Sequence, residues 1–199
     1  METAESILAF WFGTESDDAR VAEQKKQLWW AKDSAVDQEI NTRFSACTAA
    51  AAQGALDEWR ASPRGLLALI LLTDQFPRNM YRGLPASFSF DEQALRLCRQ
   101  ALEQGDDRRL RPVERVFLYL PLEHSESLVD QKRAVELFQH LCNEVPENQQ
   151  TMFAGFRNFA IRHRDVIARF GRFPHRNAIL GRTSTADEQA FLQTAGSSF

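Results

Sequence analysis

The feature that most constrains how this chain folds is a run of seven consecutive apolar residues, Leu66 to Leu72. Ser62 and Pro63 precede the run, and serine followed by proline is typical of the start of an α-helix. A helix that is apolar on every side is stable only when neighbouring elements cover every side. The run therefore predicts a central helix surrounded by the rest of the protein.

The remaining chain also has helical periodicity. Apolar residues recur at spacings of three and four, as in Val36, Ile40, Phe44 and Cys47. No segment alternates apolar and polar residues between hairpin turns, so we expect no significant sheet. The predicted fold class is all-α, with about eight helices. Besides the central one, we expect helices at residues 3–12, 20–30, 34–54, 91–104, 112–120, 127–142, 148–170 and 185–195. The longest irregular stretch should be Gln75 to Phe90, which contains Pro77 and Pro85.

Length and composition narrow the class of protein further. A chain of 199 residues suits one domain, residues 1–199, with a short flexible tail at 195–199. The net charge of −3 argues against nucleic-acid binding. No apolar run approaches the roughly 20 residues that span a membrane, and the first residues lack the basic start of a signal peptide. Three cysteines without metal-type spacing favour reduced thiols, so we expect a cytoplasmic protein.

Arginine is unusually frequent among the basic residues. It accounts for 20 of the 24, and seven arginines but only one acid, Asp165, lie between Arg157 and Arg182. A coding bias toward arginine would explain this excess without any function. Alternatively, the planar guanidinium groups serve to contact carboxylates or phosphates through two hydrogen bonds each.

Four motifs resemble a known family in both content and order. They are Ile7–Gly13, Asp74–Gly83, Leu120–Glu126 and Phe170–Asn177. Together they are similar to the bacterial domain-of-unknown-function family numbered 924, over about residues 7–192. The resemblance implies a tetratricopeptide-like, right-handed array of antiparallel helix hairpins. It implies no activity, substrate or cofactor.

Polar residues follow the most apolar helix directly. Asp74 is expected near the negative end of that helix, where a carboxylate is unfavourable. If it is buried it requires a cation, and Arg78 and Arg82 are the next cations in sequence. One interpretation is a structural clamp that fixes the following loop. The other is an acid that faces a ligand.

A second polar group follows Pro121, which should kink or end its helix because proline lacks the N–H that a helix uses. Glu123, His124 and Glu126 come next. A histidine between two carboxylates is suited to acid–base chemistry near neutral pH. The same residues would equally suit the cap of the following helix.

Two further histidines are candidate residues of a functional site. His163 lies on the apolar stripe formed by Phe156, Ala160, Ile167 and Phe170. A histidine in such a place is more often a core residue than a functional one. His175 follows in the next loop, whereas His140 is expected on the surface.

These observations combine into one hypothesis about function. The segments 74–83, 123–126 and 172–177 are predicted to converge on a small anionic ligand. Catalytic candidates are Glu123, His124 and His163. Ligand-binding candidates are Asp74, Arg78, Asn79, Arg82, Arg172, His175, Arg176 and Asn177. No metal or cofactor is expected, because helical His-x-x-x-His spacing and glycine-rich phosphate loops are absent. The alternatives are a scaffold that binds a protein or peptide, and a purely structural polar network. The sequence alone does not decide whether the chain is an enzyme.

Overall fold

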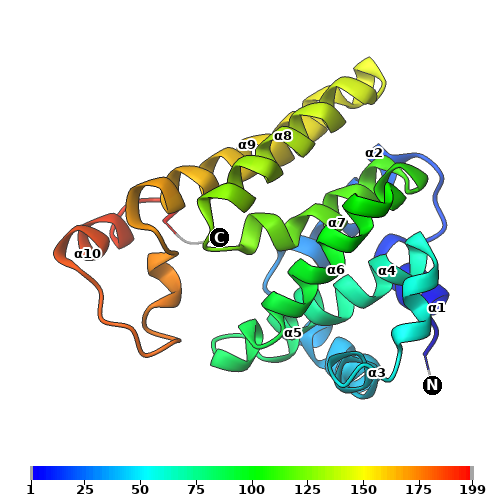
Figure 1. Ribbon diagram of the computed structural model, residues 1–199, viewed down its shortest axis with the longest axis horizontal. Coiled ribbons are helices and arrows are strands. Elements are labelled where there is room, and N and C mark those ends of the chain that lie inside the picture. The colour runs from blue at the N-terminus through cyan, green and yellow to red at the C-terminus, as the bar shows by residue number, and fades with distance from the viewer. Residues whose placement is uncertain (1, 198–199) are drawn as a thin grey trace.

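The computed structural model describes residues 2–197, and every regular element in that range is helical (Figure 1). The all-α prediction is confirmed, with no strand among the described residues. The α-helices are α1 (Ala4–Phe12), α2 (Asp18–Trp30), α3 (Ser34–Ala52), α4 (Pro63–Ile70), α5 (Phe76–Met80), α6 (Asp91–Gln104), α7 (Pro112–His124), α8 (Leu128–Glu144), α9 (Glu147–Phe170) and α10 (Ala186–Leu192). Short 3-10 turns are η1 (Asp57–Ala61), η3 (Pro85–Phe88), η4 (Asp106–Arg109) and η5 (Pro174–Arg176), and η2 (Leu71–Gln75) is a π-helical turn.

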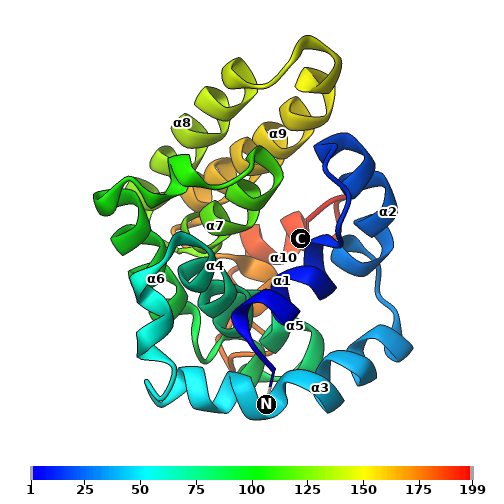
Figure 2. The same cartoon turned by 90° about the vertical axis from the view of Figure 1, so that its right-hand side faces the viewer.

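Helix α4 is the predicted central helix. Each residue from Leu66 to Leu72 is at most 2% exposed. Helices α1, α6 and α7 pack against α4, and Figure 2 shows it enclosed among them. The apolar run therefore forms the middle of the main core.

The start of α4 is fixed by its predicted cap. The backbone N–H of Gly65 donates to Ser62 Oγ at 3.0 Å. We expect Ser62→Ala to lower the free energy of unfolding by about 1 kcal/mol, because an N–H at the helix start loses its acceptor. Urea unfolding would measure this effect. No change in midpoint would show that solvent replaces the hydroxyl without cost.

The first part of the stretch predicted to be irregular after α4, residues 75–80, is helical instead. The chain passes through η2 directly into α5, and the N–H of Phe76 donates to the carbonyl oxygen of Leu71, five residues back. Pro77 follows η2 without a break in the helical chain, so it lacks an N–H that this helix would use, and its burial offsets the loss. The wide π-turn accommodates the proline, so the prediction of a loop from Gln75 was wrong.

A second correction concerns Pro121. The helix was predicted to end at Leu120, but α7 continues through Pro121 to His124. The alternative, a kink at the proline, stays a prediction. Leu120, Pro121 and Leu122 are all buried, so burial of this turn outweighs the lost hydrogen bond. Glu123 and His124 therefore belong to the last turn of a helix and not to a loop.

Packing between consecutive helices differs along the chain. In the second half α6 packs on α7, α7 on α8, and α8 on α9, with α8 and α9 forming the long antiparallel pair of Figure 1. In the first half α1 packs on α4, and α3 packs on α5. The tetratricopeptide-like array expected for the whole chain stays a prediction.

The C-terminal part packs back onto α9. Arg162 Nη2 donates to the carbonyl oxygen of Gly196 at 3.0 Å, and Ser197 is buried. The predicted flexible tail, residues 195–199, extends beyond the described residues at 198 and 199, and its flexibility stays a prediction, as does the single domain. Within residues 2–197, no helix has the length and apolar character needed to cross a membrane.

Candidate functional site

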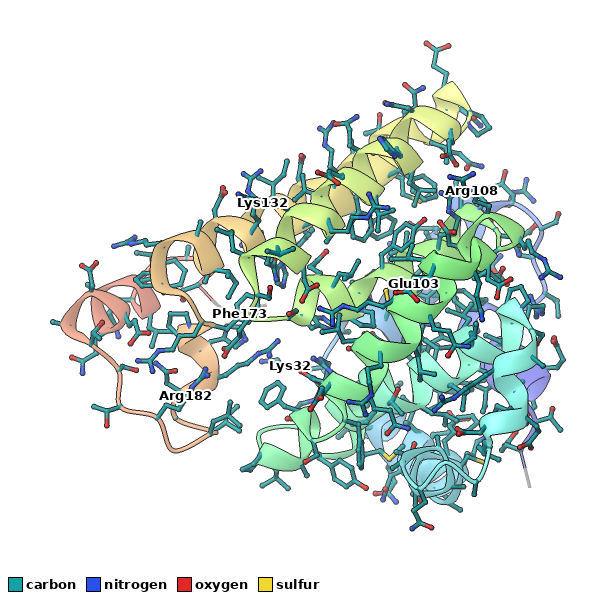
Figure 3. All side chains as sticks on the ribbon, in the orientation of Figure 1. Lys32, Glu103, Arg108, Lys132, Phe173 and Arg182 are labelled. Carbon is teal, nitrogen blue, oxygen red and sulfur yellow. The ribbon has the colours of Figure 1, made fainter. Side chains whose placement is uncertain are left out.

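Three segments that are distant in sequence meet at the C-terminal end of α7. His124 of α7 contacts Asp74 of η2, and Glu126 accepts a hydrogen bond from the backbone N–H of Phe173, after α9. Figure 3 labels Phe173 and Arg182 in this region. The predicted convergence of these segments is therefore observed.

The first element of the site is a pair formed by Asp74 and His124. His124 Nδ1 lies 2.7 Å from Asp74 Oδ1, and Gln75 Nε2 donates to Oδ2 at 2.6 Å. Burial opposes ionisation of Asp74, but Arg78 and His124 outweigh it and hold the pKa of this carboxyl well below its ordinary value. Burial and then Arg78 lower the pKa of His124. At neutral pH His124 is thus neutral, with Nδ1–H donating to the carboxylate and Nε2 left as a base.

The second element is a chain of two arginines on one carboxylate. Arg78 binds Asp91 through both terminal nitrogens, at 2.9 and 3.0 Å. Arg176 Nη1 lies 3.4 Å from the same carboxylate. Phe88 and Phe173 flank the Arg176 guanidinium, with ring centroids at 4.8 and 4.5 Å.

Arg176 is insufficiently neutralised in this arrangement. The residue is 7% exposed, and its buried Nε has no hydrogen-bond partner among the described residues. Burial, followed by repulsion from Arg78, lowers the pKa of Arg176 to about 10. The fold therefore holds a cation whose positive charge is only partly compensated.

The third element is a buried contact between Glu123 and His163. Glu123 Oε1 lies 3.1 Å from His163 Nδ1, which also lies 2.9 Å from the carbonyl oxygen of Phe159. Since a carbonyl only accepts, Nδ1 of His163 carries a hydrogen. Burial, then the negative charge of Asp74, raises the pKa of Glu123 to about 8, and burial lowers the pKa of His163 to about 3. At neutral pH both groups are neutral, with the acidic proton on Glu123.

The rings of the site lie close together. The centroids of His124 and His163 are 6.4 Å apart, and Phe173 lies 5.6 Å from both His163 and His175. Burial, then Arg176, lowers the pKa of His175 to about 4. Neutral imidazoles therefore surround the buried guanidinium and do not add positive charge to it.

Four predicted ligand-binding residues contact acids outside these three elements. Asn79 and Arg82 bind Asp37 of α3, at 2.9 and 2.8 Å. Arg172 and Asn177 bind a carboxylate of α10, at 2.6 and 3.3 Å. All four therefore contact acids within the fold, and their role in ligand binding stays a prediction. The clamp on Asp74 comes from Arg78, at 3.3 Å, and not from Arg82.

The local excess of arginine is also largely neutralised. Between Arg157 and Arg182, five arginines contact acids: Arg164 with Asp165, Arg169 with Asp187, Arg172 with Glu188, Arg176 with Asp91, and Arg182 with Glu126. Most of these acids come from outside the segment. The argument for an anion consequently depends on Arg176.

Sequence reasoning missed one residue that organises the site. Asp91 is the first residue of α6, and Phe90 occupies the cap position without a side-chain hydrogen bond. The carboxylate of Asp91 binds the two arginines. Nothing in the local sequence indicates this role, because Arg176 lies 85 residues away. The described residues contain no group of three or more His, Cys, Asp or Glu side chains placed to hold a metal ion.

Comparison with known proteins places the chain in a family. No curated protein matches the sequence. Among solved structures, the chain is similar to the protein of unknown function ATU0120 from Agrobacterium tumefaciens, with a TM-score of 0.79 and 36% identity over 96% of each chain. The family model for bacterial proteins of unknown function DUF924 matches residues 7–196. The chain therefore belongs to the DUF924 family.

Proposed function

We propose that the protein binds a small molecule carrying a carboxylate or phosphate at Arg176. We further propose that it catalyses proton transfer, with one side chain removing a proton from the bound molecule and another donating a proton to it. The observation that carries this proposal is the buried, incompletely paired guanidinium of Arg176. A buried charge without full compensation costs stability, so a protein keeps it where a ligand supplies the counter-charge. An oxygen of the anion would accept the free Nε–H.

Proton transfer is supported by the different protonation states of the adjacent groups. The imidazole of His124, oriented by Asp74, has the arrangement of a general base. Glu123, whose pKa is raised to about 8, holds a proton at neutral pH and suits a general acid. Neighbouring titratable groups whose pKa values are driven apart are typical of acid–base sites.

The two alternatives have weaker support. A scaffold would distribute its contacts along successive helices, whereas the perturbed polar groups gather at one end of α7. A purely structural network would pair a buried cation fully, yet Arg176 Nε has no partner within the described residues. Arg60 Nε and Arg157 Nε are also unpaired there, but only Arg176 of the three is a buried residue. The cytoplasmic location stays a prediction, and it is consistent with three buried free cysteines: Cys47, Cys98 and Cys142.

The proposal is tested by thermal unfolding in phosphate, sulfate, acetate and malonate at constant ionic strength. A bound anion should stabilise the protein saturably, by about 2.7 kcal/mol at a concentration 100 times its dissociation constant. Arg176→Met should abolish the saturable response to acetate and malonate and lower the response to phosphate and sulfate, because it removes the donor and the charge at this site.

Two control variants separate binding from general salt effects. Arg169→Met removes an exposed arginine 3.5 Å from Asp187 and should respond as the wild type does. His124→Asn should also retain the response, because the base acts after binding. Sulfate stabilises most proteins by exclusion from their surface. An identical response of wild type and Arg176→Met to all four anions would therefore contradict the proposal.

A further inference from the structure

A second polar pocket lies far from the candidate site, between η4, α7 and α8. Its volume is about 170 Å³. Its charged and imidazole lining consists of Asp107, Arg108, Arg115, Arg133, His140 and Glu144. Figure 3 shows Arg108 on the opposite side of the molecule from Phe173 and Arg182.

Arg115 forms the rigid inner wall of this pocket. Its Nε donates to the hydroxyl oxygen of Tyr119 at 3.0 Å, and its Nη1 pairs with Glu144. The Tyr119 hydroxyl in turn donates to Asp107 at 2.8 Å. Arg115 Nη2 lies 3.9 Å from Asp107, beyond hydrogen-bond distance, so this nitrogen keeps donors for a ligand.

The rim adds positive charge that nearby acids do not neutralise. Arg108 forms no ion pair within the described residues, and Arg133 has one exposed contact, with Glu136 at 3.3 Å. His140 contributes an exposed ring from α8. Three arginines therefore face two carboxylates, and both carboxylates already accept hydrogen bonds from Arg115 or Tyr119.

We propose that this pocket binds a phosphate group. Donors from η4, α7 and α8 approach from different directions, which suits a tetrahedral anion better than a planar carboxylate. Arginine is the preferred residue for phosphate because its donors form a fixed fork. The volume is below the roughly 300 Å³ at which sites for drug-sized molecules begin. The ligand is therefore inorganic phosphate or a small phosphomonoester and not a nucleotide.

The experiment is an NMR titration of the full chain with inorganic phosphate, glycerol phosphate and acetate, at constant pH and ionic strength. The side-chain signals of Arg115 and His140 should shift saturably with a phosphate compound and not with acetate. Whichever phosphate compound binds more tightly identifies the form of the ligand. Arg108→Ala should weaken its affinity on the order of tenfold, because one charge-assisted hydrogen bond is lost. Arg108 forms no ion pair within residues 2–197, so this variant should remain folded.

Two controls make the result specific to this pocket. Arg96→Ala removes an exposed arginine of α6 that pairs only with Glu92, and it should leave the affinity unchanged. Arg176→Met, at the other site, should also leave it unchanged. The proposal is overturned if neither phosphate compound shifts the two signals saturably, if acetate binds as tightly, or if Arg108→Ala and Arg96→Ala have the same affinity.

Discussion

Replacing Arg78 with methionine should lower the free energy of unfolding by about 3–5 kcal/mol, the usual cost of removing one partner from a buried ion pair. Arg78 contacts two carboxylates, with Nη1 3.3 Å from Asp74 and both terminal nitrogens on Asp91. Asp74 is fully buried, so it cannot recover the lost interaction from water.

The same substitution at Arg176 should have a much smaller effect, within about 1 kcal/mol of the wild type. Methionine keeps apolar contact with Phe88 and Phe173 while removing a charge that burial and Arg78 destabilise. Asp91 retains its two hydrogen bonds from Arg78. Arg78 and Arg176 contact the same carboxylate, Asp91, so their substitutions can be compared directly. We expect Arg78 to stabilise the fold and Arg176 to be available to a ligand.

Urea unfolding of both variants without added anion measures this contrast. A double-mutant cycle with Asp74→Asn and Arg78→Met should give non-additive losses, because the two side chains interact. Additive losses would show that Asp74 does not depend on Arg78. A loss at Arg176→Met as large as that at Arg78→Met would assign both arginines to the structural network and remove the main support for anion binding.

Much of the fold follows from local sequence, and its exceptions have a common cause. The apolar run at Leu66–Leu72 identifies the central helix without any knowledge of its neighbours. The predicted end of a helix before Pro121 fails because buried contacts of α7 compensate for the missing N–H. Local rules describe what an isolated segment prefers, and tertiary packing overrides them at both proline positions, Pro77 and Pro121.

Residues of the candidate site were predictable only where they lie close together in sequence or on or just after a helix with a clear apolar pattern. Asp74, His124 and His163 were found in this way. The roles of Asn79, Arg82 and Arg172 were not, since their partners Asp37 and Glu188 come from other helices. A count of local charges suggests an unpaired arginine cluster, but most of these arginines contact acids across the fold, and Arg176 is the buried member whose charge is incompletely compensated.

Glu123→Gln should stabilise the protein at pH 9 but not at pH 5. Burial raises the pKa of Glu123 from its ordinary value of 4.5 to about 8 in the folded protein. Between these values the folded state holds the proton and the unfolded state has released it. The contribution of Glu123 to stability is therefore complete below pH 4.5 and is lost as the pH rises through 8. The loss across this range is on the order of 4 kcal/mol, and glutamine, which does not ionise, should avoid it.

The difference between variant and wild type isolates this group from His163, whose pH dependence has the opposite sign. Burial lowers the pKa of His163 to about 3, so its contribution to stability falls as the pH drops below its ordinary value of 6.5. Glu126→Gln is the matched control at the same end of α7, because Arg182 and the backbone N–H of Phe173 outweigh burial and lower the pKa of Glu126. That variant should be less stable than the wild type at neutral pH, and its deficit should shrink as the pH falls below 4.5.

Urea unfolding of the three proteins from pH 3.5 to pH 9 distinguishes two states of the buried contact. If Glu123 holds its proton, the curves of wild type and Glu123→Gln separate progressively toward high pH. If the curves instead run parallel, Glu123 is ionised throughout and His163 carries the proton at 3.1 Å as an ion pair. In that state Glu123 has no proton to donate at neutral pH, and its role as the general acid would be excluded.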